Sequence, residues 1–247
     1  MKIKEIVSAL ERFAPLPLQD GFDNAGLQIG LTEVEATGAL LCLDVTEAVL
    51  DEAIALGHNL VISHHPLIFK GYKSITGKDY VERCILKAIK NDIVIYSAHT
   101  NLDNAYGGVN YKIAEKIGLK NLQVLEPKEN SLQDDLMQAG AGIVGELDEP
   151  ETELEFLKRI KKTFEVGCVR HNRLTGREIQ KVALCGGAGA FLLPQAIRAG
   201  ADVFITGEIK YHDYFGHEGD ILMAEIGHYE SEQYTKEIFY SIIRDLF

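Results

Sequence analysis

Cysteine is scarce in this chain, and no two cysteines lie close together in the sequence. The four cysteines, Cys42, Cys84, Cys168 and Cys185, are scattered and form no C-x-x-C motif. Cys42 and Cys185 lie within apolar runs, where a buried free thiol is the ordinary state. This cysteine usage predicts a reduced, cytoplasmic protein.

Long hydrophobic runs are also absent. No stretch approaches the roughly 18 consecutive apolar residues that a membrane-spanning helix needs. Charged residues at Lys4, Glu5, Glu11 and Arg12 interrupt the apolar stretch that a signal peptide would require. We therefore expect a soluble chain without a membrane partner.

Positively charged residues are also fewer than negatively charged ones. Lys and Arg number 25 against 37 Asp and Glu, which gives a net charge of −12. A polyanion would be repelled over most of such a surface, so nucleic acid is not an expected partner. What the chain does have is the composition of a globular protein, with 46% hydrophobic residues in a length of 247.

Apolar runs alternate with helical periodicity along most of the chain. Helices are expected over Ile3–Phe13, 46–55, Tyr80–Lys90, 151–164 and 191–198, and in a last helix that carries Tyr234, Ile238, Ile242 and Leu246. Buried strands are expected at 39–43, 59–63, 93–97, 181–185, 202–206 and 221–224. Continuous apolar strands that alternate with helices predict an α/β fold with largely parallel sheets.

The chain also contains a weak internal repeat. Residues 40–65 align without gaps on residues 183–208 at a constant offset of 143, with six identities. Any two strand–helix–strand units look alike, which explains part of this match. The next strands correspond too, and each leads to a histidine, so we favour two similar α/β domains. The expected division is residues 1–126 and 151–247, joined by a linker over 127–150.

Imidazole and carboxylate side chains follow three of the expected strands. His64 and His65 come directly after one strand, and His99 and Asp103 follow the next. Ligands bind at the carboxyl ends of strands in open α/β sheets. For the histidine pair alone, metal binding and plain hydrogen bonding to the backbone are equally good explanations, and a turn or helix cap would explain Asp103.

The third cluster lies in the second half of the chain. His228 and Glu232 are four residues apart at the start of the last helical segment, so both can reach one ion. Compensation of the helix dipole would explain Glu232 by itself. Together the three clusters exceed the needs of one catalytic ion, whereas two ions about 4 Å apart would use them all. Zinc, iron, manganese, nickel and cobalt all suit this donor set.

Five ordered motifs resemble the NIF3 family, also called GTP cyclohydrolase I type 2-like proteins. They are DNAGLQIG at 23–30, SHHP at 63–66, SAHTNLD at 97–103, TGEIKYHD at 206–213 and GHYESE at 227–232. The resemblance implies a dinuclear metal centre in a cleft between two similar α/β domains, and a ring-shaped homohexamer. It implies the ligands His64, His65, Asp103, His228 and Glu232, with Glu232 as the bridge.

The resemblance leaves the activity open between two classes. The family label implies a metal-dependent hydrolase that opens the imidazole ring of a guanine nucleotide or acts on a similar small nucleotide-like or phosphorylated substrate. His99 is then a candidate acid/base, or a residue that supports the metal ligands. The alternative is a non-catalytic metal-binding or regulatory protein that engages a protein partner. Many bacterial relatives carry an inserted domain, which in this chain would fall near Gln133.

Overall fold

The computed structural model describes residues 1–128, 139–217 and 219–246, and these fall into two compact units. Unit 1 comprises residues 1–102 and 235–247, and unit 2 comprises residues 103–234. The first boundary lies inside the short helix α4 (Thr100–Asn104). Gln133 marks the position near which the inserted domain of some relatives would fall, and it lies outside the described residues.

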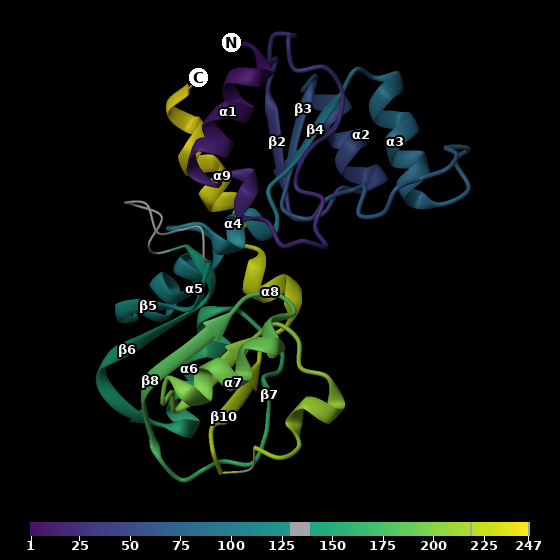
Figure 1. Cartoon of the computed structure of the whole chain (residues 1–247). Helices are drawn as coiled ribbons and strands as arrows, with labels where there is room; N and C mark the ends of the chain where they lie inside the picture. Colours follow the sequence, from purple (N-terminus) through teal and green to yellow (C-terminus); the bar gives the residue numbers. More distant parts are fainter. Residues whose placement is uncertain (129–138, 218, 247) are drawn as a thin grey trace. The chain divides into compact units, whose positions relative to one another are not determined.

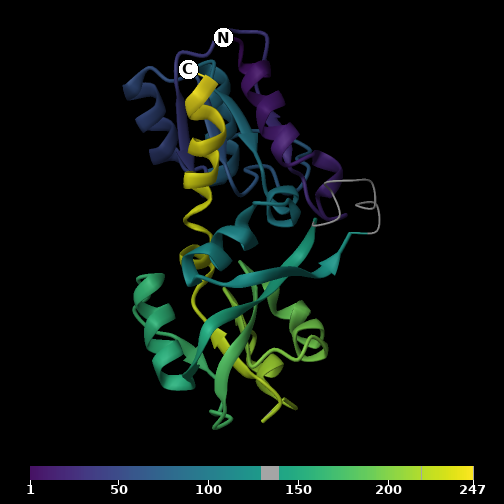
Figure 2. The same cartoon turned by 90° about the vertical axis from the view of Figure 1, so that its left-hand side faces the viewer.

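Unit 1 is built on a four-stranded sheet in the order β1 (Gly26–Ile29), β4 (Val94–Ser97), β3 (Leu60–Ser63) and β2 (Ala39–Cys42). β2, β3 and β4 are parallel, and β1 runs antiparallel to β4. Helices α2 (Glu47–Leu56) and α3 (Tyr80–Lys90) cover one face, and α1 (Ile3–Phe13) and α9 (Thr235–Ile243) cover the other (Figures 1 and 2). Every residue of β3 and β4 is buried, as expected for a covered parallel sheet.

Unit 2 is built on a six-stranded sheet. Its order is β5 (Lys120–Pro127), β6 (Gly140–Thr152), β8 (Glu178–Cys185), β9 (Val203–Thr206), β10 (Leu222–Glu225) and β7 (Arg170–His171). Helices α5 (Val109–Ile117) and α6 (Glu153–Thr163) pack on β6 and β8, while α7 (Leu193–Arg198) packs with the core around Phe204 (Figure 1). Helix α8 (His228–Glu232) follows β10.

Short 3₁₀ helices complete the described secondary structure, at Leu16–Leu18, Gly189–Leu192, Tyr211–Tyr214 and Arg244–Leu246. The helices expected over Ile3–Phe13 and Tyr80–Lys90 have the predicted ends. Within the described parts of the chain, no helix combines the length and apolar character that crossing a membrane requires.

The register of the two sheets confirms the duplicated strand–helix–strand units. In unit 1 Ala39 pairs with Leu60, and in unit 2 Val182 pairs with Val203. These pairs differ by the same offset of 143 that aligns the two sequences. The carboxyl ends of β2 and β3 therefore correspond to those of β8 and β9.

The segment expected as a linker contains a strand instead. β6 occupies residues 140–152, which overlap the range 127–150 that was expected to be a linker. Its glycines permit close strand pairing, because a Cβ on Gly140 would lie 2.2 Å from the Glu126 carbonyl oxygen and one on Gly145 would lie 2.8 Å from that of Lys120. The compact units thus differ from the expected halves, and the C-terminal helix α9 belongs to unit 1.

The buried carboxylate of Glu82 predicts a measurable effect of pH on stability. Its Oε2 accepts hydrogen bonds from the backbone N–H groups of Thr76, Gly77 and Lys78. Bonds from Thr76 and Lys78 lower the pKa of Glu82 from 4.5 to about 2, although burial acts in the opposite direction. Stability from this charge is therefore present above pH 4.5 and lost as the pH falls toward 2.

Glu82→Gln is accordingly expected to lower the melting temperature at neutral pH. The deficit should shrink as the pH is lowered from 4.5 toward 2, because the wild-type carboxylate then becomes protonated too. Melting curves recorded across this range test it, with the exposed Glu52→Gln as the matched control. A deficit that stays constant with pH would contradict the assigned role of the charge.

Candidate metal centre

Two histidines of unit 1 follow β3 where the strand breaks. The hydroxyl of Ser63 donates to the carbonyl of His65 at 2.9 Å and lies 2.8 Å from the Ser97 hydroxyl on β4. The bend between Ser63 and His65 brings two consecutive side chains together, although neighbouring residues in a regular strand point to opposite faces. The ring centroids of His64 and His65 are 4.9 Å apart, and His64 is fully buried.

The third histidine of unit 1 follows the neighbouring strand. β3 and β4 are parallel and end in register at Ser63 and Ser97, so the residues beyond them meet at one edge of the sheet. The ring of His99 lies 5.2 Å from that of His64 and 5.4 Å from that of His65. The three residues offer ligand atoms that all lie within 4.8 Å of one another. They form what we call the three-histidine cluster.

Each ring of the three-histidine cluster is held through its Nδ1 atom by an oxygen 2.8 Å away. The acceptors are the Ala98 carbonyl for His64, Asp44 Oδ1 for His65 and Asp23 Oδ1 for His99. A neutral imidazole that donates from Nδ1 keeps a lone pair on Nε2. Metal-ligating histidines are oriented in this same way, so the cluster suits a divalent transition-metal ion.

Asp23 is the most firmly anchored of these acceptors. Its side chain is fully buried, and its Oδ2 accepts from the backbone N–H of Thr100 at 3.0 Å. Burial would raise the pKa of Asp23, but hydrogen bonds from His99 and Thr100 outweigh it and bring the pKa to about 2. The carboxylate therefore stays charged and fixes the ring of His99 at neutral pH.

Unit 2 gathers a second group at the ends of its own parallel strands. β9 and β10 pair Thr206 with Glu225, and the residues beyond them include Glu208 and His228. Glu208 Oε1 lies 2.7 Å from His228 Nδ1, and Glu232 Oε2 lies 3.1 Å from His228 Nε2. Glu232 is buried, at 3% exposure. His228 and Glu232 therefore present one nitrogen and one oxygen to the same point.

A glycine turn after β8 makes room for this pair. A Cβ built on Gly187 would lie 2.3 Å from Glu232 Oε1 and 3.3 Å from His228 Nε2. The backbone N–H of Gly187 donates to the Ser231 hydroxyl at 3.0 Å, which ties the turn to α8. The glycine-rich segment 186–189 therefore makes a tight turn against Glu232 and His228.

The remaining predicted residue, Asp103, lies in α4 at the boundary of the two units. It is the first residue of unit 2, and its backbone carbonyl accepts from Asn110 Nδ2 at 3.0 Å. The structure thus brings His64, His65 and His99 together in unit 1, and His228 and Glu232 together in unit 2. His212 joins neither group, since its ring packs on those of Tyr211 and Phe215.

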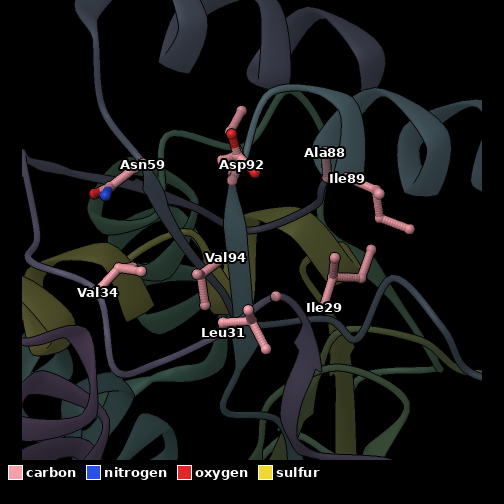
Figure 3. A pocket seen from close by; sticks show the side chains of 10 residues that line it. Ile29, Leu31, Val34, Asn59, Ala88, Ile89, Asp92 and Val94 are labelled. Carbon is pink, nitrogen blue, oxygen red and sulfur yellow. The ribbon is translucent and has the colours of Figure 1, made fainter.

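Two cavities differ in their relation to these residues. One has a volume of about 460 Å³ and mainly apolar walls. It lies at the amino ends of β3 and β4, whereas the histidines follow the carboxyl ends of these strands. Figure 3 shows its lining, which includes Ile29, Leu31, Val34, Asn59, Ile89, Asp92 and Val94. Another of about 320 Å³ lies in unit 2 and is lined by Ala188, Ala190, Phe191, Glu208, Lys210 and Asp213. Because Glu208 also accepts a hydrogen bond from His228, the second cavity adjoins the candidate metal ligands.

The residues that orient the imidazoles are not evident from the sequence alone. Asp23 and Glu208 lie inside quoted motifs, but Asp44 lies outside them. One signal was available for Glu208, which aligns with His65 at the offset of 143 and therefore follows the equivalent strand. Asp44 and Asp23 are separated from their histidines by 21 and 76 residues, so only the fold reveals these pairings.

Comparison with known proteins identifies the family. A protein from Clostridium perfringens named GTP cyclohydrolase 1 type 2 homolog is 38% identical over 235 residues, which cover 94% of this chain and 87% of that protein. A Lactococcus lactis protein of the same name is 35% identical over 251 residues, covering 99% and 91% of the two chains.

Solved structures of the same family resemble this chain along its whole length. The crystal structure of a Bacillus cereus protein related to NIF3 matches with a TM-score of 0.90 and 29% identity, over 100% of this chain and 93% of that one. The family model for Duf34/NIF3 (NGG1p interacting factor 3) matches residues 1–247. The chain therefore belongs to the Duf34/NIF3 family.

Proposed function

We propose that this chain is a metal-dependent hydrolase with a dinuclear metal centre, acting on a small nucleotide-like or phosphorylated substrate. His64, His65, Asp103, His228 and Glu232 hold the two divalent ions, and Glu232 bridges them. The observation that carries the proposal is the uniform orientation of the histidines. In both units, an oxygen lies within 2.8 Å of the Nδ1 atom of each clustered imidazole, which is the way in which metal-ligating histidines are oriented.

The contact between His228 and Glu232 also favours a bound cation. When Nδ1 of His228 donates to Glu208, its Nε2 and the Glu232 oxygen 3.1 Å away are both electron-pair donors. They need a cation between them, which is either a proton on Nε2 or a metal ion. In unit 1 the three ring centroids lie about 5 Å apart, and each ring offers a ligand atom within 4.8 Å of the others.

The donor set fits borderline divalent ions. Imidazole and carboxylate ligands without thiolate suit zinc, iron, manganese, nickel or cobalt. When bound, such ions supply Lewis-acid polarisation of a substrate oxygen and activate water near neutral pH. The chain's own contribution is to orient the ligands His65 and His228 through Asp44 and Glu208, and to bury Glu232. Asp23 fixes the neighbouring His99 in the same way.

The cavity beside Glu208 supports a small phosphorylated substrate only with a bound cation, because Glu208 and Asp213 place two carboxylates on its wall beside Lys210. Lys210 offers an exposed ammonium group, and Phe191 offers an aromatic side chain that is 58% exposed. A cation and an aromatic face are the groups that bind a phosphate and a planar base. A nucleotide-like molecule placed here would adjoin His228.

Turnover of candidate substrates tests the catalytic part. Protein reconstituted with zinc, iron, manganese, nickel or cobalt is assayed against guanine nucleotides and simple phosphoesters. We expect activity that falls at least a hundredfold in Glu232→Gln and survives in Glu230→Gln, which makes the same chemical change two residues away on α8. Lys210→Ala should raise KM more than it lowers kcat.

The opposite outcome would favour the non-catalytic alternative. Fully metal-loaded protein that turns over none of these compounds, and that retains a specific protein in pull-downs only when metal is bound, would identify a metal-dependent partner-binding protein. The same pull-down with Glu232→Gln is the matched control for the role of the metal.

A glycine substitution tests the geometry around Glu232. Gly187→Ala places a Cβ 2.3 Å from Glu232 Oε1 and is expected to reduce the metal content by about one ion per chain. Gly200→Ala is the matched control, because Gly200 has φ +69 against +58 for Gly187 but no atom within 4 Å of the added Cβ. Both variants carry a similar backbone cost of about 1–2 kcal/mol. Equal metal contents in the two variants would contradict the crowding of Glu232.

A homohexamer is the assembly that we propose for this chain. Light scattering at physiological salt should show a species near six times the 27.4 kDa chain mass. A monomer at micromolar concentration would contradict the ring.

A further inference from the structure

The apolar cavity of unit 1 is lined by none of the candidate metal ligands. Its volume of about 460 Å³ lies within the range of pockets that hold small organic molecules. Its walls come from the end of β1 and the loop after it, the residue before β3, the end of α3 and the start of β4. Ile29, Ala88 and Ile93 in these walls also belong to the hydrophobic core of unit 1. A molecule in this cavity would therefore rest on the core itself.

The walls of the cavity are held in place by close packing and hydrogen bonds. Gly30, with φ of +98, brings the end of β1 so close to β4 that a Cβ on it would lie 2.8 Å from Val94 Cγ2. The side-chain amide of Asn59 donates to the Glu35 carbonyl at 2.8 Å and accepts from the backbone N–H of Thr37 at 2.9 Å. A cavity that is already formed loses little conformational freedom when a ligand enters it.

Asp92 is the only ionisable residue among those that line the cavity. In Figure 3 its side chain lies between Asn59 on one side and Ala88 and Ile89 on the other, with Val94 below. Within the described residues, the Asp92 carboxylate makes no hydrogen bond or ion pair. A cation that enters the cavity therefore meets a carboxylate that no described side chain neutralises.

The position of Asp92 is unfavourable for the unliganded protein in two ways. Asp92 follows the C-terminal end of α3 with φ of +54, a left-handed conformation that glycine adopts most readily at this place. The same end of a helix carries negative partial charge, which repels a carboxylate. In the last turn, Lys87 Nζ binds Asp51 Oδ1 at 2.7 Å, and Lys90 is not among the lining residues. An asparagine would suit the fold at least as well, so the carboxylate points to a bound cation.

We propose that this cavity binds a small organic cation, an alkyl- or arylamine whose apolar body fills the cavity and whose ammonium group pairs with Asp92. The negative end of α3 stabilises the same ammonium group. The apolar body covers Leu31, Val34 and Ile89, which are 77%, 43% and 56% exposed without it. The site lies at the amino ends of β3 and β4, away from the histidines at their carboxyl ends, and it does not depend on metal.

Three probes of equal chain length test the charge preference. Hexylamine, hexanol and hexanoate are titrated into the intact chain at neutral pH, and binding is followed by calorimetry. We expect hexylamine to bind at least tenfold more tightly than hexanol, because its ammonium group donates a charge-assisted hydrogen bond to Asp92. Hexanoate should not bind, and bound hexylamine should raise the melting temperature. Equal affinities for hexylamine and hexanol would contradict the pairing with Asp92.

Variants of the cavity test its position. Asp92→Asn removes the charge but keeps a residue that tolerates the left-handed backbone, so its melting temperature should equal or exceed that of the wild type. It should weaken hexylamine binding at least tenfold, to the level of hexanol. Asp220→Asn is the matched control, because the exposed Asp220 stands before β10 as Asp92 stands before β4.

Val34→Trp provides a second, independent variant at the half-exposed mouth of the cavity. The indole should fill the cavity and abolish binding of hexylamine and hexanol alike. An unchanged hexylamine affinity in a folded Asp92→Asn or Val34→Trp variant would overturn the site.

Metal removal separates this site from the metal centre. Hexylamine should bind chelator-treated and metal-loaded protein equally, and binding that requires metal would overturn the proposal by placing the amine at the metal centre. Absence of binding by all three probes would also overturn it. If Leu31→Glu then separates the proposed hexamer into smaller species, the cavity is a contact between copies of the chain. A chain that binds no metal leaves these measurements unaffected, so the two proposals can fail separately.

Discussion

Glu232→Gln is expected to lower the metal content from two ions per chain to about one. Glu232 is buried beside His228 and, as the proposed bridge, contributes an oxygen to both ions. A neutral amide cannot supply a bridging carboxylate, so the ion that depends on unit 2 is lost. The remaining ion should bind more weakly, because it loses one anionic ligand.

The measurement is metal analysis of wild type, Glu232→Gln and Glu230→Gln after the same reconstitution. Glu230 lies on the same short helix, and its substitution should leave two ions in place. His228→Ala should resemble Glu232→Gln, because each removes one side of the contact of 3.1 Å. Full occupancy in Glu232→Gln would show that this carboxylate is not a ligand.

Removal of the metals is expected to lower the melting temperature strongly. A ligand that binds only the folded state at a thousand times its Kd adds about 4 kcal/mol. One kcal/mol shifts the melting temperature of a chain of this size by roughly 2–4 °C. Each emptied site should therefore cost on the order of 10 °C, and re-addition of metal should restore the transition.

Scanning calorimetry before and after chelation tests this effect. The chelator-treated Glu232→Gln variant, which is expected to start with fewer ions, should show a smaller fall than the wild type. A wild type whose melting temperature is the same with and without chelator would show that no tightly bound ion supports the fold.

The parts of the fold that depend on local patterns could be predicted from the sequence. The helices at Ile3–Phe13 and Tyr80–Lys90 have the ends that their periodicity indicated, and the buried strands were recognised as apolar runs. β6 was missed because glycine and acidic residues resemble a linker. In the structure, Gly140 and Gly145 instead allow β6 to pair closely with β5.

The candidate site shows the same contrast. Residues that follow a strand could be predicted from the sequence, whereas residues that distant segments contribute could not. The histidines and carboxylates could be selected because each follows the end of an expected strand. The groups that hold the imidazoles could not, because they come from other segments: Asp23 from the loop before β1, and Asp44 from the bend after β2. The boundary within α4 was also not visible, since the chain returns to unit 1 only at Thr235.

The most direct test is the stoichiometry of the wild-type protein. Purified chain is stripped with chelator, reconstituted separately with zinc, iron, manganese, nickel or cobalt, freed of excess metal, and analysed for bound ions per chain. A dinuclear centre predicts two ions per chain for at least one of these metals. A content that stays below one ion per chain for all of them would contradict the proposed centre.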